Sequence, residues 1–243
     1  MNLSYKIIVA RFNENIDWID NIGSIANHCI IYNKGFSLNK KYPIIDIPNI
    51  PIYAREGTSI LKYIIDNYND LPDYLFFIQA DPFDHCFNFL DVFTYMIQNI
   101  EKLKPYQPMT FGWSIDKKIP PIENILYDNR NYINDYKIYM QYSNYALQPL
   151  NYYDVGLQDI LHKFKEYNKI DHDNIINFLY KRLNLTNKIN PNYIIFNYGS
   201  MFGVKKQNIL NNSLKFYIDL NTFNEEHETH IFMLERMWYS IFN

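Results

Sequence analysis

The pattern of hydrophobic and polar positions predicts that strands and helices alternate along the first half of the chain. Three nearly continuous apolar runs are typical of strands buried on both faces of a parallel sheet, and they occupy residues 5–10, 28–35 and 73–79. Between them, apolar residues recur at helical spacing, which predicts a short helix over 11–22 and a longer helix over 55–68. This alternation indicates βαβ units.

The rest of the pattern predicts further elements around one long irregular stretch. We expect helices over about 89–103, 156–167, 172–183, 205–220 and 228–242, strands over 108–113, 192–199 and 200–204, the last two paired, and a short strand at 44–47 within a proline-containing loop. Residues 114–154 are polar and poorly periodic, which indicates an irregular insertion. The fold class expected is one α/β domain over 1–243, with a mostly parallel central sheet flanked by helices.

Composition and charge narrow the possible partners. The chain has 243 residues, of which 48% are hydrophobic, and this suits one domain with a sizeable core. Its 23 basic and 26 acidic side chains are interspersed, so we expect no nucleic-acid partner. Cys29 and Cys86 make no disulfide framework, and the first apolar run is too short for a signal peptide or a membrane span. A cytoplasmic protein without a membrane span is expected.

Polar residues follow three of the predicted strands, at the edge where open α/β sheets bind ligands. Each group alone is explained as a turn, whereas the three together favour a site. The groups are Arg11 to Glu14, Asn33 to Gly35, and Gln79 to His85.

The third group carries the sharpest candidate chemistry. Asp81 and Asp84 end a buried strand, and carboxylate oxygens suit a hard divalent cation such as Mg²⁺ or Mn²⁺. His85 is a borderline additional ligand that favours Mn²⁺. The alternative for Asp84 is that it caps the helix that begins near Phe89.

A second cluster of ligand-type residues lies near the C-terminus, in the sequence HETH at 227–230. Its histidines are three residues apart, whereas the zinc-protease motif HExxH needs four, so a metalloprotease is excluded. A cluster of five residues here is either a set of ligands or a solvated first helical turn: Glu225, Glu226, His227, Glu228 and His230.

Glu235 is an acid within an otherwise apolar predicted helix. It is either paired, with Arg236 or Arg55, or a catalytic base whose pKa is raised by burial.

Several blocks of the sequence resemble an uncharacterised protein family of fungi and large DNA viruses. The blocks run in order from residue 7 to 242 and skip most of 105–190: IIVARFNEN, IIYNKG, REGTSILKYIIDNYNDLPDYLFFIQADPFDH, YGSMFGVKKQNIL and LERMWYSIF. This family looks like a distant relative of glycosyltransferases with the Rossmann-related GT-A fold. IIVARFNEN is similar to the opening strand of those enzymes, and FFIQADPFD is similar to the strand that delivers their metal-binding DxD motif.

The resemblance implies a metal-dependent glycosyltransferase that moves a sugar from a nucleotide-sugar donor to a hydroxyl acceptor. Mn²⁺ or Mg²⁺ would be held by Asp81 and Asp84, although the sequence DPFD has two residues between the acids where the motif has one. The implied donor-binding residues are Arg11, Asn13, Glu14, Asn33, Lys34, Arg55, Glu56 and Gln79, the implied additional metal ligands are His85, His227 and His230, and the candidate bases are Glu235, Glu226 and Glu228.

Two other functions remain open at this point. The same Asp81, Asp84 and His85 could activate water in a metal-dependent phosphohydrolase, which would turn over without an acceptor. Alternatively, the altered acidic motif would fit a GT-A-like binding or scaffold module that has lost catalysis. In each case a cytoplasmic location is expected, that of a host cell if the protein is viral.

Overall fold

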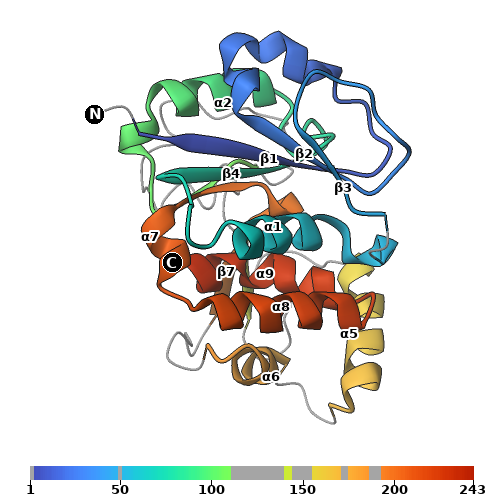
Figure 1. Ribbon diagram of the computed structural model, residues 1–243. Helices are drawn as coiled ribbons and strands as arrows, with labels where there is room; N and C mark the ends of the chain where they lie inside the picture. The colour runs from blue at the N-terminus through green and yellow to red at the C-terminus, as the bar shows by residue number, and fades with distance from the viewer. Residues whose placement is uncertain (1–2, 49–50, 111–139, 144–154, 171–174, 186–192) are drawn as a thin grey trace.

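A six-stranded sheet forms the centre of the protein (Figure 1). The computed structural model describes residues 3–48, 51–110, 140–143, 155–170, 175–185 and 193–243. The strands lie in the order β3-β2-β1-β4-β8-β5. Their bounds are Tyr5–Arg11 (β1), Cys29–Asn33 (β2), Ile44–Asp46 (β3), Tyr74–Gln79 (β4), Tyr106–Pro108 (β5) and Phe202–Lys205 (β8).

The sheet is mixed, so the expectation of a mostly parallel sheet is wrong. β1 pairs in parallel with β2 and β4, and β2 pairs in parallel with β3. β8 is antiparallel to both β4 and β5. The apolar runs predicted where the strands lie, but a continuous apolar run fits either direction of pairing once both faces of the strand are buried.

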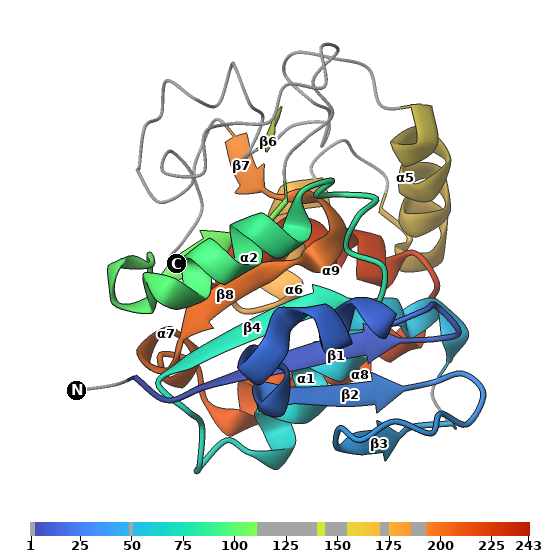
Figure 2. The same cartoon turned by 90° about the horizontal axis from the view of Figure 1, so that it is seen from above.

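Helices cover both faces of the sheet (Figures 1 and 2). One face packs on η1 and α2, and the other packs on a larger cluster that contains α1, α8 and α9. The helices are η1 (Asp17–His28), η2 (Ile52–Ala54), α1 (Arg55–Asp66), α2 (Phe89–Gln98), η3 (Ile100–Lys102), α5 (Val155–Asn168), α6 (Ile175–Arg182), η5 (Tyr198–Ser200), α7 (Lys206–Leu210), α8 (Leu214–Glu226) and α9 (His230–Phe242).

The two strands predicted to pair with each other belong to different sheets. β7 (Tyr193–Phe196) pairs with β6 (Met140–Ser143) in a separate two-stranded sheet, whereas β8 joins the central sheet. η5 redirects the chain between them, and Gly199 there has a φ of 74° that favours glycine. β6 is a strand inside the stretch predicted to be irregular, of which 114–139 and 144–154 lie outside the described residues.

Two further boundaries differ from the prediction. The helix expected over 205–220 is divided into α7 and α8, because the side chain of Ser213 accepts a hydrogen bond from the amide of Phe216 and caps a new helix. The strand expected over 108–113 begins earlier, as β5, and its last residues lie outside the described part of the chain.

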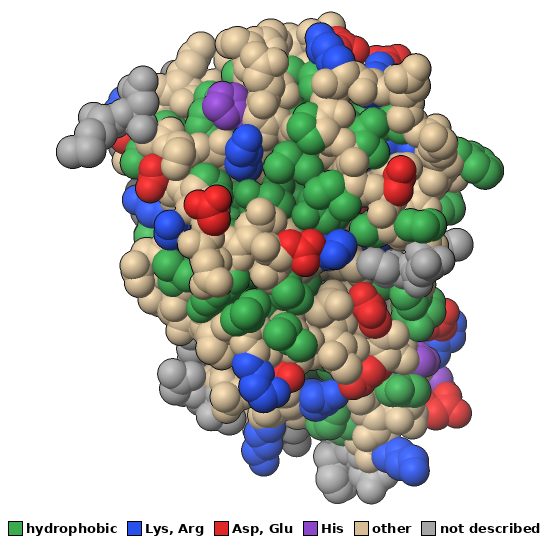
Figure 3. Space-filling view, viewed as in Figure 1, with side chains coloured by type: hydrophobic (Ala, Val, Ile, Leu, Met, Phe, Trp, Pro, Cys, Tyr) green, Lys and Arg blue, Asp and Glu red, His purple; other side chains and the backbone are tan. Residues whose placement is uncertain are grey.

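Charged side chains of both signs are interspersed over the face shown in Figure 3. Among the helices that the structure describes, none combines the length and the apolar character needed to cross a bilayer.

Candidate functional site

The carboxyl ends of β1, β2 and β4 meet at one edge of the sheet. Parallel pairing sets Arg11 beside Asn33 and Ala10 beside Gln79. The chain leaves β1 through η1 on one face of the sheet and enters β4 from α1 on the other face. The strand order therefore reverses between β1 and β4, and open α/β sheets bind ligands outside the strand ends at such a point.

Arg11 and Asn33 hold the loops after β1 and β2 together. The guanidinium of Arg11 donates to the side-chain oxygen of Asn33 at 2.6 Å and to three loop carbonyl oxygens at 3.0, 3.1 and 3.2 Å. Asn33 donates in turn to the carboxylate of Asp46 on β3 at 2.8 Å. These contacts give Arg11 and Asn33 a structural role at the site, since most of their polar atoms organise the loops.

Gly35 allows these two loops to touch. A Cβ atom at this position would lie 1.5 Å from the carbonyl oxygen of Phe12 and 2.3 Å from the side-chain oxygen of Asn13. That oxygen of Asn13 accepts a hydrogen bond from the amide of Phe36 at 2.9 Å, and the carboxylate of Glu14 accepts one from the amide of Phe12 at 2.7 Å. Asn13 and Glu14 therefore shape the loop backbone beside the strand ends.

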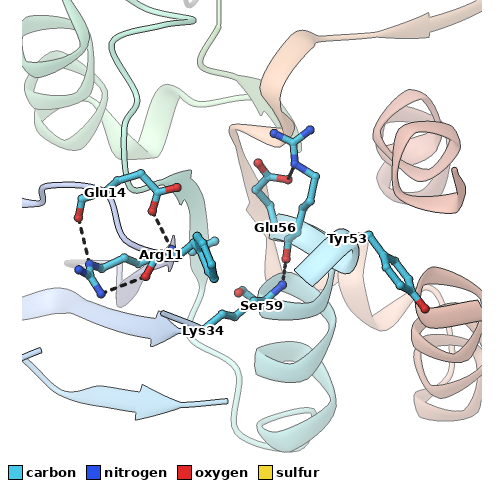
Figure 4. Close-up of a pocket in the computed structure, with 9 residues that line it drawn as sticks. Arg11, Glu14, Lys34, Tyr53, Glu56 and Ser59 are labelled. Carbon is cyan, nitrogen blue, oxygen red and sulfur yellow. Dashed lines mark hydrogen bonds and ion pairs between the residues drawn. The ribbon is translucent and has the colours of Figure 1, made fainter. Parts of the chain in front are cut away.

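A cavity of about 330 Å³ opens next to these loops (Figure 4). Its walls come from the end of β1, the residue after β2, and the segment that leads into α1. The lining residues are Ala10, Arg11, Phe12, Glu14, Lys34, Tyr53, Arg55, Glu56 and Ser59. Five residues predicted from the sequence as donor-binding thus line one cavity. Of the other three, Asn33 and Gln79 contact the lining residues Arg11 and Glu56, and Asn13 lies between Phe12 and Glu14 in the chain.

Lys34 crosses the cavity towards the N-terminus of α1, as Figure 4 shows. Its ammonium group donates to the carbonyl oxygen of Arg55. The pKa of Lys34 is lowered to about 8: burial is the largest cause and the Arg55 cation acts in the same direction, whereas the carboxylates of Glu56 and Glu225 oppose the shift. Lys34 therefore remains mostly protonated at neutral pH while it is held in a largely desolvated position.

The first turn of α1 brings Arg55 and Glu56 to the cavity. Arg55 has a positive φ of 40°, which is strained for a residue with a side chain. Its guanidinium lies over the ring of Phe232 on α9 and 3.9 Å from the carboxylate of Glu56. The same carboxylate accepts a hydrogen bond of 2.6 Å from Gln79 at the end of β4. Glu56 thus links the cavity to the neighbouring strand end.

Ser59 and Tyr53 line the cavity but were not predicted from the sequence. Ser59 is 0% exposed, and within the described residues its hydroxyl has no hydrogen-bond partner. Tyr53 is 39% exposed and donates to the carbonyl oxygen of Glu225 at 3.0 Å. The available signal for Ser59 was its spacing of three residues from Glu56, which places both on one side of a helix.

Asp81 and Asp84 lie on the loop that follows β4 and are both exposed. Asp81 accepts a hydrogen bond from the amide of Phe83 at 3.2 Å. The alternative that Asp84 caps α2 is wrong, because Asn88 occupies the N-cap position and no side chain there makes a capping hydrogen bond. Both carboxylates therefore keep solvent-facing oxygen atoms at the strand end.

Glu235 approaches the same edge of the sheet from α9. Its carboxylate accepts a hydrogen bond of 2.6 Å from the amide of Gly199, and the ring of His85 packs against Gly199 from the β4 loop. Burial is the largest influence on the pKa of Glu235 and raises it, Glu56 raises it further, and Arg236, the Gly199 amide and His85 lower it. The Arg236 guanidinium is 3.6 Å away. Glu235 is thus both a partner of Arg236 and an acid with a raised pKa.

The four residues of the HETH cluster form the junction between α8 and α9. His230 is fully buried, stacks on Phe223, and uses its two ring nitrogens towards the Phe223 carbonyl oxygen (2.7 Å) and the side chain of Asn168 (3.3 Å). His227 stacks on Tyr167, and its Nδ1 lies 2.8 Å from the Thr229 hydroxyl.

The two acids of this junction contact neighbouring helices. Glu226 pairs with Arg182 of α6 at 2.7 Å, and Glu228 lies 3.9 Å from Lys163 of α5. Across the parts of the chain that the structure describes, no group of three or more His, Cys, Asp or Glu side chains is arranged to hold a metal ion. The junction therefore packs helices together, and the protein side chains described at 81–85 offer two acids and not a complete ligand shell.

Comparison with known proteins identifies the family. Residues 7–243 match a family model described as Protein of unknown function (DUF3431), so the chain belongs to that family. No curated protein and no solved structure matches the chain.

Proposed function

For this member of a family of unknown function, we propose a glycosyltransferase that moves a sugar from a nucleotide-sugar donor to a hydroxyl acceptor. The observation that carries the proposal is the position of the 330 Å³ cavity, at the carboxyl edge of the sheet where strand order reverses. The order β3-β2-β1-β4 matches one half of a doubly wound nucleotide-binding sheet. A relationship to the GT-A fold, proposed from the strand-end blocks, agrees with this position.

The cavity chemistry suits such a donor. Lys34 and Arg55 supply positive charge for phosphate, and Glu56 and Ser59 supply polar atoms for hydroxyl groups. Exposed aromatic side chains at Phe12 and Tyr53 add apolar surface at its wall.

A divalent cation fits the end of β4 as part of the proposal. Mg²⁺ typically uses one or two protein carboxylates and completes its shell with water and substrate phosphates, which matches two exposed acids at Asp81 and Asp84. When bound, Mg²⁺ or Mn²⁺ would stabilise negative charge on the leaving diphosphate.

Glu235 is the best candidate for the base among the three acids named from the sequence. Glu226 is paired with Arg182, and Glu228 is an exposed neighbour of Lys163. Glu235 alone among them contacts the strand-end region, and burial raises the pKa of its carboxyl above the ordinary value. In an inverting transfer, Glu235 would take the proton of the acceptor hydroxyl while the oxygen of that hydroxyl forms the new bond to the sugar carbon. The bond from that carbon to the diphosphate oxygen would break at the same time.

Calorimetric titration tests the proposal. UDP, GDP and their common sugar conjugates are titrated into wild type and Asp81→Ala, with and without Mn²⁺. Binding of a nucleotide sugar, followed by product formation only when an acceptor is added, supports a transferase. Turnover without an acceptor would indicate a phosphohydrolase, and absence of nucleotide binding in every condition would leave a binding or scaffold module.

A further inference from the structure

We propose that the cavity at the N-terminus of α1 binds the phosphate of a phosphorylated sugar or nucleotide through Lys34, Ser59 and the first turn of the helix, without a divalent cation. This inference deepens the proposed function and rests on the same cavity. In this inference the phosphate is contacted by groups of the protein and not by a metal ion.

The unpaired hydroxyl of Ser59 is the first observation. Ser59 lines the cavity and is completely buried, yet among the described residues its oxygen has no hydrogen-bond partner. Buried polar groups in folded proteins are nearly always hydrogen-bonded, so a buried hydroxyl without a partner, on a residue that lines a cavity, points to a ligand whose binding supplies one. A phosphate oxygen accepts from a hydroxyl donor.

Lys34 is the second observation. Its ammonium group has three donors, and among the described residues one of them is used, in the hydrogen bond to the carbonyl oxygen of Arg55. Lys34 and Ser59 line the same cavity, so a ligand bound there could accept from the remaining donors. Burial already weakens the hold of Lys34 on its proton, and a bound anion would restore the interactions that water no longer provides.

The helix itself is the third observation. α1 has 12 residues, its first turn lines the cavity, and no side chain in the described part of the chain caps its N-terminus. The N-terminus of a helix carries partial positive charge and suits an anion. Lys34, Ser59 and this turn therefore present donors to one space from two elements of the fold.

The acids in the cavity wall are engaged elsewhere. The carboxylate of Glu56 accepts from Gln79 at 2.6 Å, and the carboxylate of Glu14 accepts from the amide of Phe12 at 2.7 Å. Neither Asp81 nor Asp84 lines the cavity. The contacts available to a phosphate there are consequently those of Lys34, Arg55, Ser59 and the helix.

The test is titration calorimetry with inorganic pyrophosphate, UDP and GDP in EDTA, repeated with Mn²⁺. The variants are Lys34→Met and Ser59→Ala, and the matched control is Lys62→Met, which removes an α1 lysine that pairs with Asp66 outside the cavity. We expect binding in EDTA that Lys34→Met weakens about tenfold or more and Ser59→Ala weakens several-fold, while Lys62→Met binds like wild type. Thermal melting checks that each variant is folded. If Lys34→Met does not fold, the affinity of Ser59→Ala tests the phosphate site.

The outcomes separate this inference from the proposed function. Pyrophosphate binding in EDTA without any nucleotide-sugar binding supports the phosphate site and excludes the proposed glycosyltransferase activity. Nucleotide-sugar binding that needs Mn²⁺, disappears in Asp81→Ala and is unchanged in Lys34→Met supports the glycosyltransferase and overturns the phosphate site. Absence of anion binding in EDTA, or equal affinity in Lys34→Met and Lys62→Met, also overturns it.

Discussion

The strand-end cavity and the α8–α9 junction contain the same kinds of residue but use them differently. The junction holds two histidines and two acids within five residues, and their polar atoms contact neighbouring helices or the backbone. The cavity draws its residues from three separate segments, and it retains an unpaired hydroxyl and a lysine with further donors. Density of ligand-type residues in the sequence is therefore a poor guide here, and the unpartnered polar atoms of the cavity are the reason why we propose the site there.

The largest effect expected from this comparison is a loss of stability at the junction. His230→Ala removes a fully buried ring stacked on Phe223 and both of its hydrogen bonds, and we expect the free energy of unfolding to fall by roughly 3 kcal/mol. Urea denaturation measures the loss, and His162→Ala on the exposed side of α5 is the control. Pyrophosphate affinity should not change. A folded His230→Ala that loses anion binding would place the junction in the site.

A smaller loss is expected from Gly199→Ala, which tests the link between α9 and the β4 loop. Gly199 has a φ of 74°, and an added Cβ atom would lie 2.6 Å from the ring of His85. We expect a cost of about 1–2 kcal/mol from backbone strain, with a larger cost if His85 cannot move. The variant also displaces the amide that Glu235 accepts from, so turnover should fall while pyrophosphate binding in EDTA persists. Unchanged turnover would separate Glu235 from the chemistry.

The sequence predicted the positions of most elements and named five of the nine residues that line the cavity, but not how they combine. The apolar runs located β1, β2 and β4, and parallel pairing of β1 with its neighbours then brought Arg11, Lys34 and Gln79 to one edge. The antiparallel direction of β8 depends on contacts between residues far apart in the chain, which local periodicity does not contain.

The sequence also did not show which polar side chains have hydrogen-bond partners. Ser59 is one small polar residue on a largely apolar helix face, and nothing in its neighbours indicates that its hydroxyl is unpaired. In the sequence His230 looked like a metal ligand. Its actual partners, the Phe223 carbonyl oxygen and Asn168, come close to it only in the folded protein.

The junction should also make stability depend on pH. Burial lowers the pKa of His230 below its ordinary value of 6.5, with His227 and Arg182 acting in the same direction and the Phe223 carbonyl oxygen and Glu226 opposing them. The unfolded chain therefore binds a proton at a higher pH than the folded protein does. The contribution of His230 to the free energy of unfolding is complete above about pH 6.5. It declines as pH falls below that value, by at most about 1.4 kcal/mol per pH unit. Urea denaturation between pH 7.5 and 5.5 measures this slope, which should be smaller in His230→Ala than in His162→Ala.

The smallest effect, and the one that most sharpens the comparison, is a gain in stability from Glu235→Gln. Burial raises the pKa of Glu235, so the folded protein binds a proton more tightly than the unfolded chain. That contribution favours the folded state at low pH and is lost as pH rises through the raised pKa, so the cost of the ionised carboxylate to folding grows as pH rises. The amide side chain of the variant would be neutral at every pH, so we expect a gain of about 1 kcal/mol at pH 7.5 that shrinks towards pH 5.

The contact between Glu235 and Arg236 opposes the effect of burial, and the balance of the two distinguishes a functional acid from a structural one. Its carboxylate is 3.6 Å from the guanidinium of Arg236, and an ion pair that dominated would make Glu235→Gln less stable at pH 7.5. Urea denaturation at both pH values therefore distinguishes two roles for one side chain. A gain in stability together with lost turnover and retained anion binding indicates an acid kept at the strand edge at a cost to folding, as expected for a base. A loss in stability would make Glu235 a structural partner of Arg236, like the paired acids of the α8–α9 junction, and would remove it from the proposed mechanism.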